Sequence, residues 1–159
     1  LPRAEGPEAS LNSAMRYAAL GPGKRLRPFL TMELGNLVHG DERGLLRAAC
    51  AVECIHAYSL IHDDLPCMDD DELRHGKPTL HRAFDEATAV LAGDCLHALA
   101  FDILTQPDTS TDPFTRAELV ATLARASGRC AQPFGACWCL RRQQRRKQWR
   151  TRRRRRRRR

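Results

Sequence analysis

Two long stretches with apolar residues at helical spacing limit what this chain can fold into. They span about residues 44–64 and 85–105. Shorter helical patterns cover 8–20, 28–38 and 113–127, and no alternating pattern of useful strand length is present. A helix with an apolar side must bury it against another element. The sequence therefore predicts an all-α protein.

An acidic segment directly follows the first long helix. Six of the ten residues from Asp63 to Glu72 are acids. One interpretation is a solvated acidic turn. The preceding helix is apolar, however, and adjacent carboxylates at the end of a buried helix are costly unless cations neutralise them. Mg²⁺ typically binds one or two carboxylates together with substrate phosphates and water, so the segment indicates a magnesium site.

Four aspartates are the candidate magnesium ligands, namely Asp63, Asp64, Asp69 and Asp70. On a straight helix, Asp69 would lie on a different side from Asp63. Pro66 would let the chain bulge and bring Asp69 back to the metal side, and Asp70 is the alternative ligand if the helix stays regular.

Basic residues and a histidine accompany this segment. Lys24, Arg25 and Arg27 lie on or just after the loop formed by Gly21–Gly23, and helical spacing puts His56 on the side of the helix that leads to the acids. Taken separately, these are surface charges and a core histidine. Their occurrence together favours a site for an anionic phosphate ligand.

The end of the chain differs in composition from the rest. Residues 141–159 hold thirteen arginines and one lysine without an acid, so their net charge is +14. Because the whole chain has a net charge of +8, residues 1–140 have a net charge of −6. The seven cysteines include no Cys-x-x-Cys pair, so we expect reduced thiols and a cytoplasmic protein. No stretch approaches the roughly 20 apolar residues that a membrane span needs, so we expect no span. The absence of an initial Met suggests a truncated start.

Five segments occur in a specific order and spacing: residues 23–28 (GKRLRP), 53–64 (ECIHAYSLIHDD), 65–71 (LPCMDDD), 74–79 (RHGKPT) and 91–96 (LAGDCL). Together they resemble the polyprenyl synthetase family of trans-isoprenyl diphosphate synthases, most closely the bacterial farnesyl diphosphate synthases. The resemblance covers about residues 10–128. It implies the N-terminal part of a helical bundle around a deep cavity, usually dimeric, that uses Mg²⁺ to condense an allylic diphosphate (dimethylallyl or geranyl) with isopentenyl diphosphate.

The resemblance also implies roles for individual residues. Lys24, Arg27 and His56, with Arg25 beside them, would bind isopentenyl diphosphate, and Arg74 would contact the allylic diphosphate. The catalytic aspartates Asp63, Asp64 and Asp69, with Asp70 helping, would hold magnesium on that diphosphate. His75 stands where the family usually has a second Arg, which would weaken the site. Tyr58 and Ser59, just before the acidic segment, would set product length, and the bulky Tyr58 favours a fifteen-carbon product.

A larger departure bears on activity. The family carries a second aspartate-rich motif downstream, and this chain has none, so we expect little or no synthase activity from it alone. The resemblance ends near residue 128. Residues 129–159 are interpreted as a disordered or out-of-frame tail, separate from a partial synthetase domain over 1–128.

Other functional classes fit the sequence less well. The arginine-rich tail would attract anionic polymers nonspecifically, but it lacks a recognition element for a specific nucleic acid. A histidine–aspartate phosphohydrolase would need more histidine ligands, and a terpene cyclase has no use for the basic loop. The alternative that remains is an inactive truncated chain whose tail binds anionic polymers.

Overall fold

The computed structural model describes residues 1–128. Residues 1–123 form one compact unit, and residues 124–159 belong to a second, of which only 124–128 are described. The predictions for the 129–159 tail therefore lie outside the described residues. Six helices and one two-stranded hairpin account for the regular structure of the described part, and the all-α prediction is confirmed.

The elements follow the predicted order along the chain. They are α1 (Ala9–Ala19), α2 (Leu26–Leu37), α3 (Glu42–Asp64), β1 (Leu73–Arg74), β2 (Lys77–Pro78), α4 (Leu80–Ala83), α5 (Glu86–Thr105) and α6 (Pro113–Ser127). The hairpin and α4 lie between the two long predicted helices, where the sequence predicted no regular element. Strands of two residues are too short to produce an alternating pattern.

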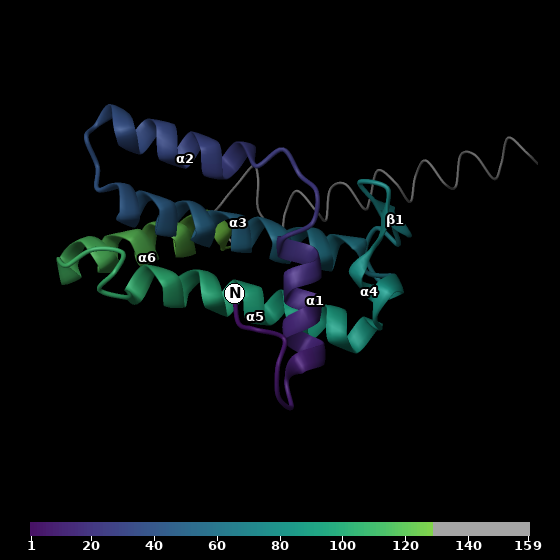
Figure 1. Cartoon of the computed structure of the whole chain (residues 1–159). Coiled ribbons are helices and arrows are strands. Elements are labelled where there is room, and N and C mark those ends of the chain that lie inside the picture. Colours follow the sequence, from purple (N-terminus) through teal and green to yellow (C-terminus); the bar gives the residue numbers. More distant parts are fainter. Residues whose placement is uncertain (129–159) are drawn as a thin grey trace, which may run out of the picture. The chain divides into compact units, whose positions relative to one another are not determined.

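The core forms where α3 and α5 pack side by side, with α1 running across them (Figure 1). Small residues allow this close approach: Ala51, Ala89, Ala92 and Ala100 are fully buried. The His62 ring of α3 lies over Gly93 of α5, where a Cβ atom would come within 2.4 Å of the ring nitrogen. The close packing of these small residues fixes the position of α3, and the acidic segment begins at the end of this helix.

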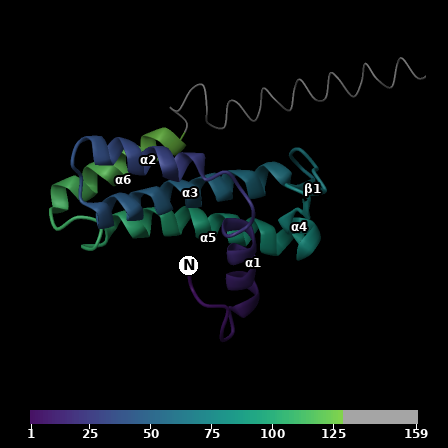
Figure 2. The same cartoon turned by 45° about the horizontal axis from the view of Figure 1, so that its top comes forward.

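On its other side α3 packs against α2 (Figure 2). Only this inner side of α2 is well covered within the described residues. Large apolar residues on the rest of α2 are exposed, namely Leu26, Phe29, Leu30, Leu34 and Leu37. The packing on α3 places the N-terminal end of α2, with its basic residues, next to the middle of α3.

Two described helices, α3 and α5, are long and apolar enough by length and composition alone to cross a membrane. The expectation that no stretch would reach this length is therefore wrong. Core helices of bundles meet the same criteria, and these two contribute most of the buried core, so the absence of a membrane span stays a prediction.

The start of α3 provides a test of the packing. The Asp41 carboxylate caps the helix by accepting a hydrogen bond from the Gly44 N–H at 2.7 Å. A Cβ atom at Gly44 would lie 2.5 Å from the backbone oxygen of buried Thr109. We expect Gly44→Ala to lower the free energy of unfolding by about 1–2 kcal/mol despite the better helix propensity of alanine. Urea denaturation measures this, and an unchanged or higher stability would disprove the close contact.

Candidate functional site

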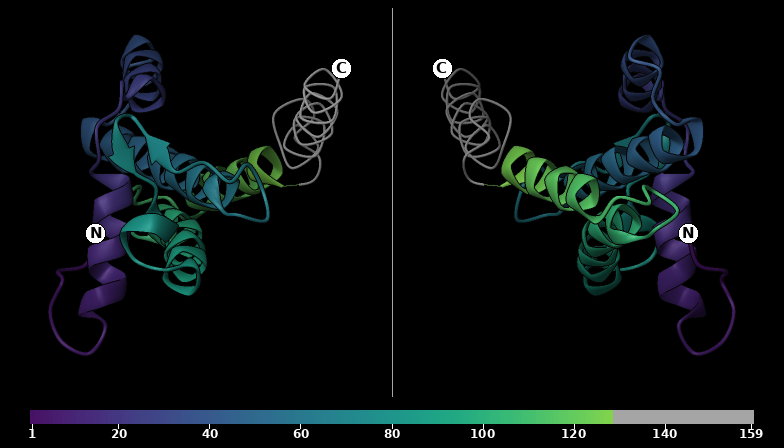
Figure 3. Two further views of the ribbon diagram at one scale, coloured as in Figure 1. Left: turned by 90° about the vertical axis from the view of Figure 1, so that its right-hand side faces the viewer. Right: turned by 90° about the vertical axis from the view of Figure 1, so that its left-hand side faces the viewer.

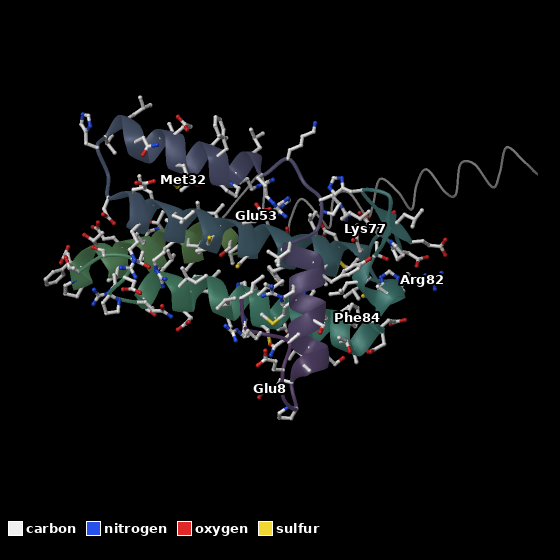
Figure 4. The ribbon with its side chains drawn as sticks, in the orientation of Figure 1. Glu8, Met32, Glu53, Lys77, Arg82 and Phe84 are labelled. Atoms are coloured by element: carbon white, nitrogen blue, oxygen red, sulfur yellow. The ribbon has the colours of Figure 1, made fainter. Side chains whose placement is uncertain are left out.

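A cavity of about 320 Å³ opens between α1, the loop before α2, α3 and the hairpin. It is lined by all six residues predicted to bind substrate: Lys24, Arg25, Arg27, His56, Arg74 and His75. Lys77, to which sequence reasoning gave no role, lines it as well. Figure 3 shows the hairpin at one end of the bundle, and Figure 4 shows Glu53 and Lys77 on the elements around the cavity. Three segments distant in sequence thus supply the basic side chains of one cavity.

Arg25 holds the basic loop against α3. Its guanidinium donates to the Glu53 carboxylate and to the Gly21 carbonyl. The Glu53 side chain is only 17% exposed, and Arg25 itself has a φ of 49°, in the left-handed region. These contacts fix the loop at both ends. Arg25 therefore has protein partners in this structure, whereas Lys24 and Arg27 have no acidic partner among the described residues.

His56 lies beside Arg27, with 3.3 Å between its Nε2 and the guanidinium. Because a guanidinium can only donate, Nε2 accepts and the ring is neutral with its proton on Nδ1. Burial lowers the pKa of His56 below its ordinary value of about 6.5, and the charges of Arg27, Arg74 and Arg25 lower it further. A bound anion would offset those charges, so this histidine is poised to take up a proton with its ligand.

This shift predicts a pH dependence of stability. As pH falls, the unfolded chain binds a proton at His56 before the folded chain does, so the contribution of His56 to stability is full above about pH 6.5 and is lost below it. We expect the free energy of unfolding to fall less between about pH 7.5 and pH 5.5 in His56→Gln than in the unmodified chain. His39→Gln, at an exposed position, is the control. Identical pH profiles for all three proteins would refute the prediction.

Asp64 and Arg74 form an ion pair at the edge of the cavity. Arg74 Nε donates to Asp64 Oδ2 at 2.7 Å, and a second guanidinium nitrogen contacts Oδ1. Burial raises the pKa of the Asp64 carboxyl and Arg74 opposes this shift, while the hydrogen bonds to Asp64 raise the pKa of Arg74. Since arginine stays protonated, the bidentate contact favours the ionised form of Asp64 and opposes the effect of burial. In this structure Arg74 binds Asp64, so a bound diphosphate would have to share the Arg74 guanidinium with that carboxylate.

The rest of the acidic segment reverses direction after α3 ends. The Asp69 N–H donates to the Asp63 carbonyl at 2.8 Å, and Asp70 adopts a φ of 54°. The chain thus brings Asp69 next to Asp63 by a turn after the helix, where a bulge within a helix was expected. Within residues 1–128, no three His, Cys, Asp or Glu side chains are grouped to hold a metal ion. The four predicted aspartates therefore do not form a complete metal site by themselves.

Tyr58 and Ser59 do not line the cavity. The Tyr58 ring packs against His62 and His97, with ring centres 4.7 and 4.8 Å away, and so lies on the side of α3 that faces α5. The Ser59 hydroxyl donates to the carbonyl of His56 at 2.8 Å. The two residues predicted to set product length are thus separated from the basic cavity.

Comparison with known proteins decides the family. The family model for polyprenyl synthetase matches residues 8–135. The chain belongs to the polyprenyl synthetase family. It is 53% identical over 125 residues to the farnesyl diphosphate synthase of Haemophilus influenzae, covering 78% of this chain and 42% of that protein. It is also 53% identical over 119 residues to geranylgeranyl pyrophosphate synthase 4 of Arabidopsis thaliana, covering 75% of this chain and 32% of that one.

A solved structure of this family agrees. An FPP/GFPP synthase from Zymomonas mobilis superposes with a TM-score of 0.79 at 57% identity, over 82% of this chain and 47% of that one. The chain spans less than half the length of these polyprenyl synthetase relatives. Because synthases named for different products match equally well, the comparisons establish the family and leave the product open.

The acidic segment fits the magnesium expected for a polyprenyl synthetase. Its donors are the hard carboxylate oxygens that Mg²⁺ prefers, and one or two of them suffice where phosphate oxygens complete the coordination. Asp63 and Asp69, brought together by the turn, would be those two. Asp64 is engaged by Arg74, and its part would require that ion pair to open or to be shared.

Proposed function

We propose that this chain forms the diphosphate-binding part of a farnesyl-type prenyltransferase of isoprenoid biosynthesis, which joins an allylic diphosphate to isopentenyl diphosphate. The observation that carries the proposal is the cavity in which Lys24, Arg27 and His56 meet Arg74 of the hairpin. Convergent cations in one concave site suit a diphosphate, and neutral ligands would gain nothing from them. A cytoplasmic location and a dimer of the whole protein belong to the same proposal.

Each residue then has a defined task. Lys24 and Arg27 hold the diphosphate of isopentenyl diphosphate, and His56 takes up a proton as the anion arrives. Mg²⁺, bound by Asp63 and Asp69, would draw negative charge from the allylic diphosphate and make it a better leaving group. Arg74 contacts that diphosphate from the edge of the cavity. Since both substrates are anionic, this division keeps two diphosphates apart on separate sets of cations.

A chimera tests the proposed reaction. Residues 1–128 would replace the matching part of the Zymomonas mobilis FPP/GFPP synthase, and transfer of labelled isopentenyl diphosphate to geranyl diphosphate would be measured with Mg²⁺. The proposal predicts a prenyl product, with the parent synthase assayed in parallel. A chimera that folds, as judged by circular dichroism, but forms no product would count against it.

The same chimera tests Tyr58. Its ring occupies space between α3 and α5, five residues before Asp63, or about 7.5 Å along a helix. If this ring limits the growing chain, Tyr58→Ala should shift the main product from fifteen carbons to longer ones, as measured by chromatography. Phe114→Ala, which removes an exposed aromatic ring from α6, is the control and should leave the main product unchanged. An unaltered product distribution in Tyr58→Ala would remove Tyr58 from this role.

A further inference from the structure

Lys77 is a cavity residue that the proposed function has not used. Antiparallel pairing of β1 and β2 sets Lys77 directly opposite Arg74. Side chains of directly opposed residues project from the same side of the two strands, about 5 Å apart at their Cβ atoms. Both residues line the cavity. Figure 4 labels Lys77 at the hairpin. The hairpin therefore presents two cations to the same space.

The acids of the site leave Lys77 without a partner. Glu53 pairs with Arg25, and Asp64 pairs with Arg74. Among residues 1–128, no ion pair or hydrogen bond engages the Lys77 ammonium. Like charges directly across two strands destabilise a hairpin, and an anion bound to Lys77 would relieve that repulsion. Lys77 thus brings an uncompensated charge to the cavity that Lys24 and Arg27 also line, and such a charge can make a further contact to phosphate.

We propose that Lys77 binds the same diphosphate group as Lys24 and Arg27. The inference rests on the proposed function, because it takes the cavity to be a diphosphate site. The compact ammonium on its four-carbon stem can follow a ligand that enters from solvent. The hairpin thereby gives each diphosphate a cation, Arg74 for the allylic diphosphate and Lys77 for the diphosphate of isopentenyl diphosphate. A lysine that is only solvated would leave affinity unchanged on substitution.

The test is a titration of the 159-residue chain with isopentenyl diphosphate, followed by the NMR signals of Gly23 and His56. These two residues line the cavity, so the dissociation constant obtained from their signals reports binding at the cavity and not at other places on the chain. We expect Lys77→Gln to weaken binding about three- to fivefold and Lys77→Arg to keep it near the unmodified value. Arg82→Gln removes one exposed charge outside the cavity and should have no effect.

The outcomes separate the two proposals. Equal affinities for Lys77→Gln and Arg82→Gln, with the unmodified chain binding at the cavity, overturn the role of Lys77 and leave the proposed function standing. No change at Gly23 or His56 in the unmodified chain, at any ligand concentration reached, overturns both. A loss in Lys77→Gln that Lys77→Arg restores supports a charge contact at this position.

Discussion

Replacing Arg74 with alanine is expected to lower the free energy of unfolding by about 2–4 kcal/mol. The Asp64 side chain is only 4% exposed, and both of its oxygens are bound by the Arg74 guanidinium. Removing that partner leaves a buried carboxylate that must stay charged without compensation or take up a proton. Arg74 itself is 31% exposed, so water can enter and the loss falls short of that for a fully enclosed pair.

Two further variants show whether the buried charge is the cause. Adding Asp64→Asn to Arg74→Ala should recover part of the stability, because no ionised group is then left buried. Arg82→Ala breaks the exposed Arg82–Glu72 pair and should cost less than about 1 kcal/mol. Urea denaturation followed by circular dichroism gives all three values. If Arg74→Ala is as stable as Arg82→Ala, the ion pair does not hold the end of α3.

Joint replacement of Lys24 and Arg27 by glutamine is expected to weaken isopentenyl diphosphate binding at the cavity by about a hundredfold or more. Each residue would lose one charge-assisted contact to phosphate, worth roughly 1.5–3 kcal/mol, and 1.4 kcal/mol corresponds to a factor of ten. Both side chains are exposed and have no acidic partner among the described residues, so their removal should leave folding intact. The NMR signal of His56 reports the dissociation constant.

The matched control removes two charges elsewhere. Arg43→Gln with Arg82→Gln changes the net charge equally at exposed positions outside the cavity. We expect its affinity to stay within about twofold of the unmodified chain at physiological salt, where distant charges are screened. Equal losses in the two double variants would mean that net charge, and no particular contact, attracts the ligand.

The helices could be predicted from the sequence because their signals are local. The spacing of apolar residues located α3 and α5. The first long helix was predicted to start at about residue 44, and α3 starts two residues earlier because the Asp41 side chain caps it. The hairpin was missed because its strands have two residues each. Its turn had a local signal, since His75 and Gly76 both adopt a positive φ and glycine favours that conformation.

For the site, the sequence predicted which residues gather but not how they pair. Lys24, Arg27, His56 and Arg74 do line one cavity. That Arg25 would bind Glu53, 28 residues away, depends on how the loop meets α3, which no local pattern encodes. Lys77 was overlooked for a related reason, because only the strand register shows that it faces the same way as Arg74.

Hydrogen–deuterium exchange of the 159-residue chain, with and without isopentenyl diphosphate, tests the central claim most directly. The claim is that the cavity between the basic loop, α3 and the hairpin binds a diphosphate. It predicts slower amide exchange over 21–27 and 73–80 when ligand is added, and no such slowing over these segments in the Lys24→Gln, Arg27→Gln variant. Unchanged exchange in both segments, or slowing confined to residues 129–159, would contradict it.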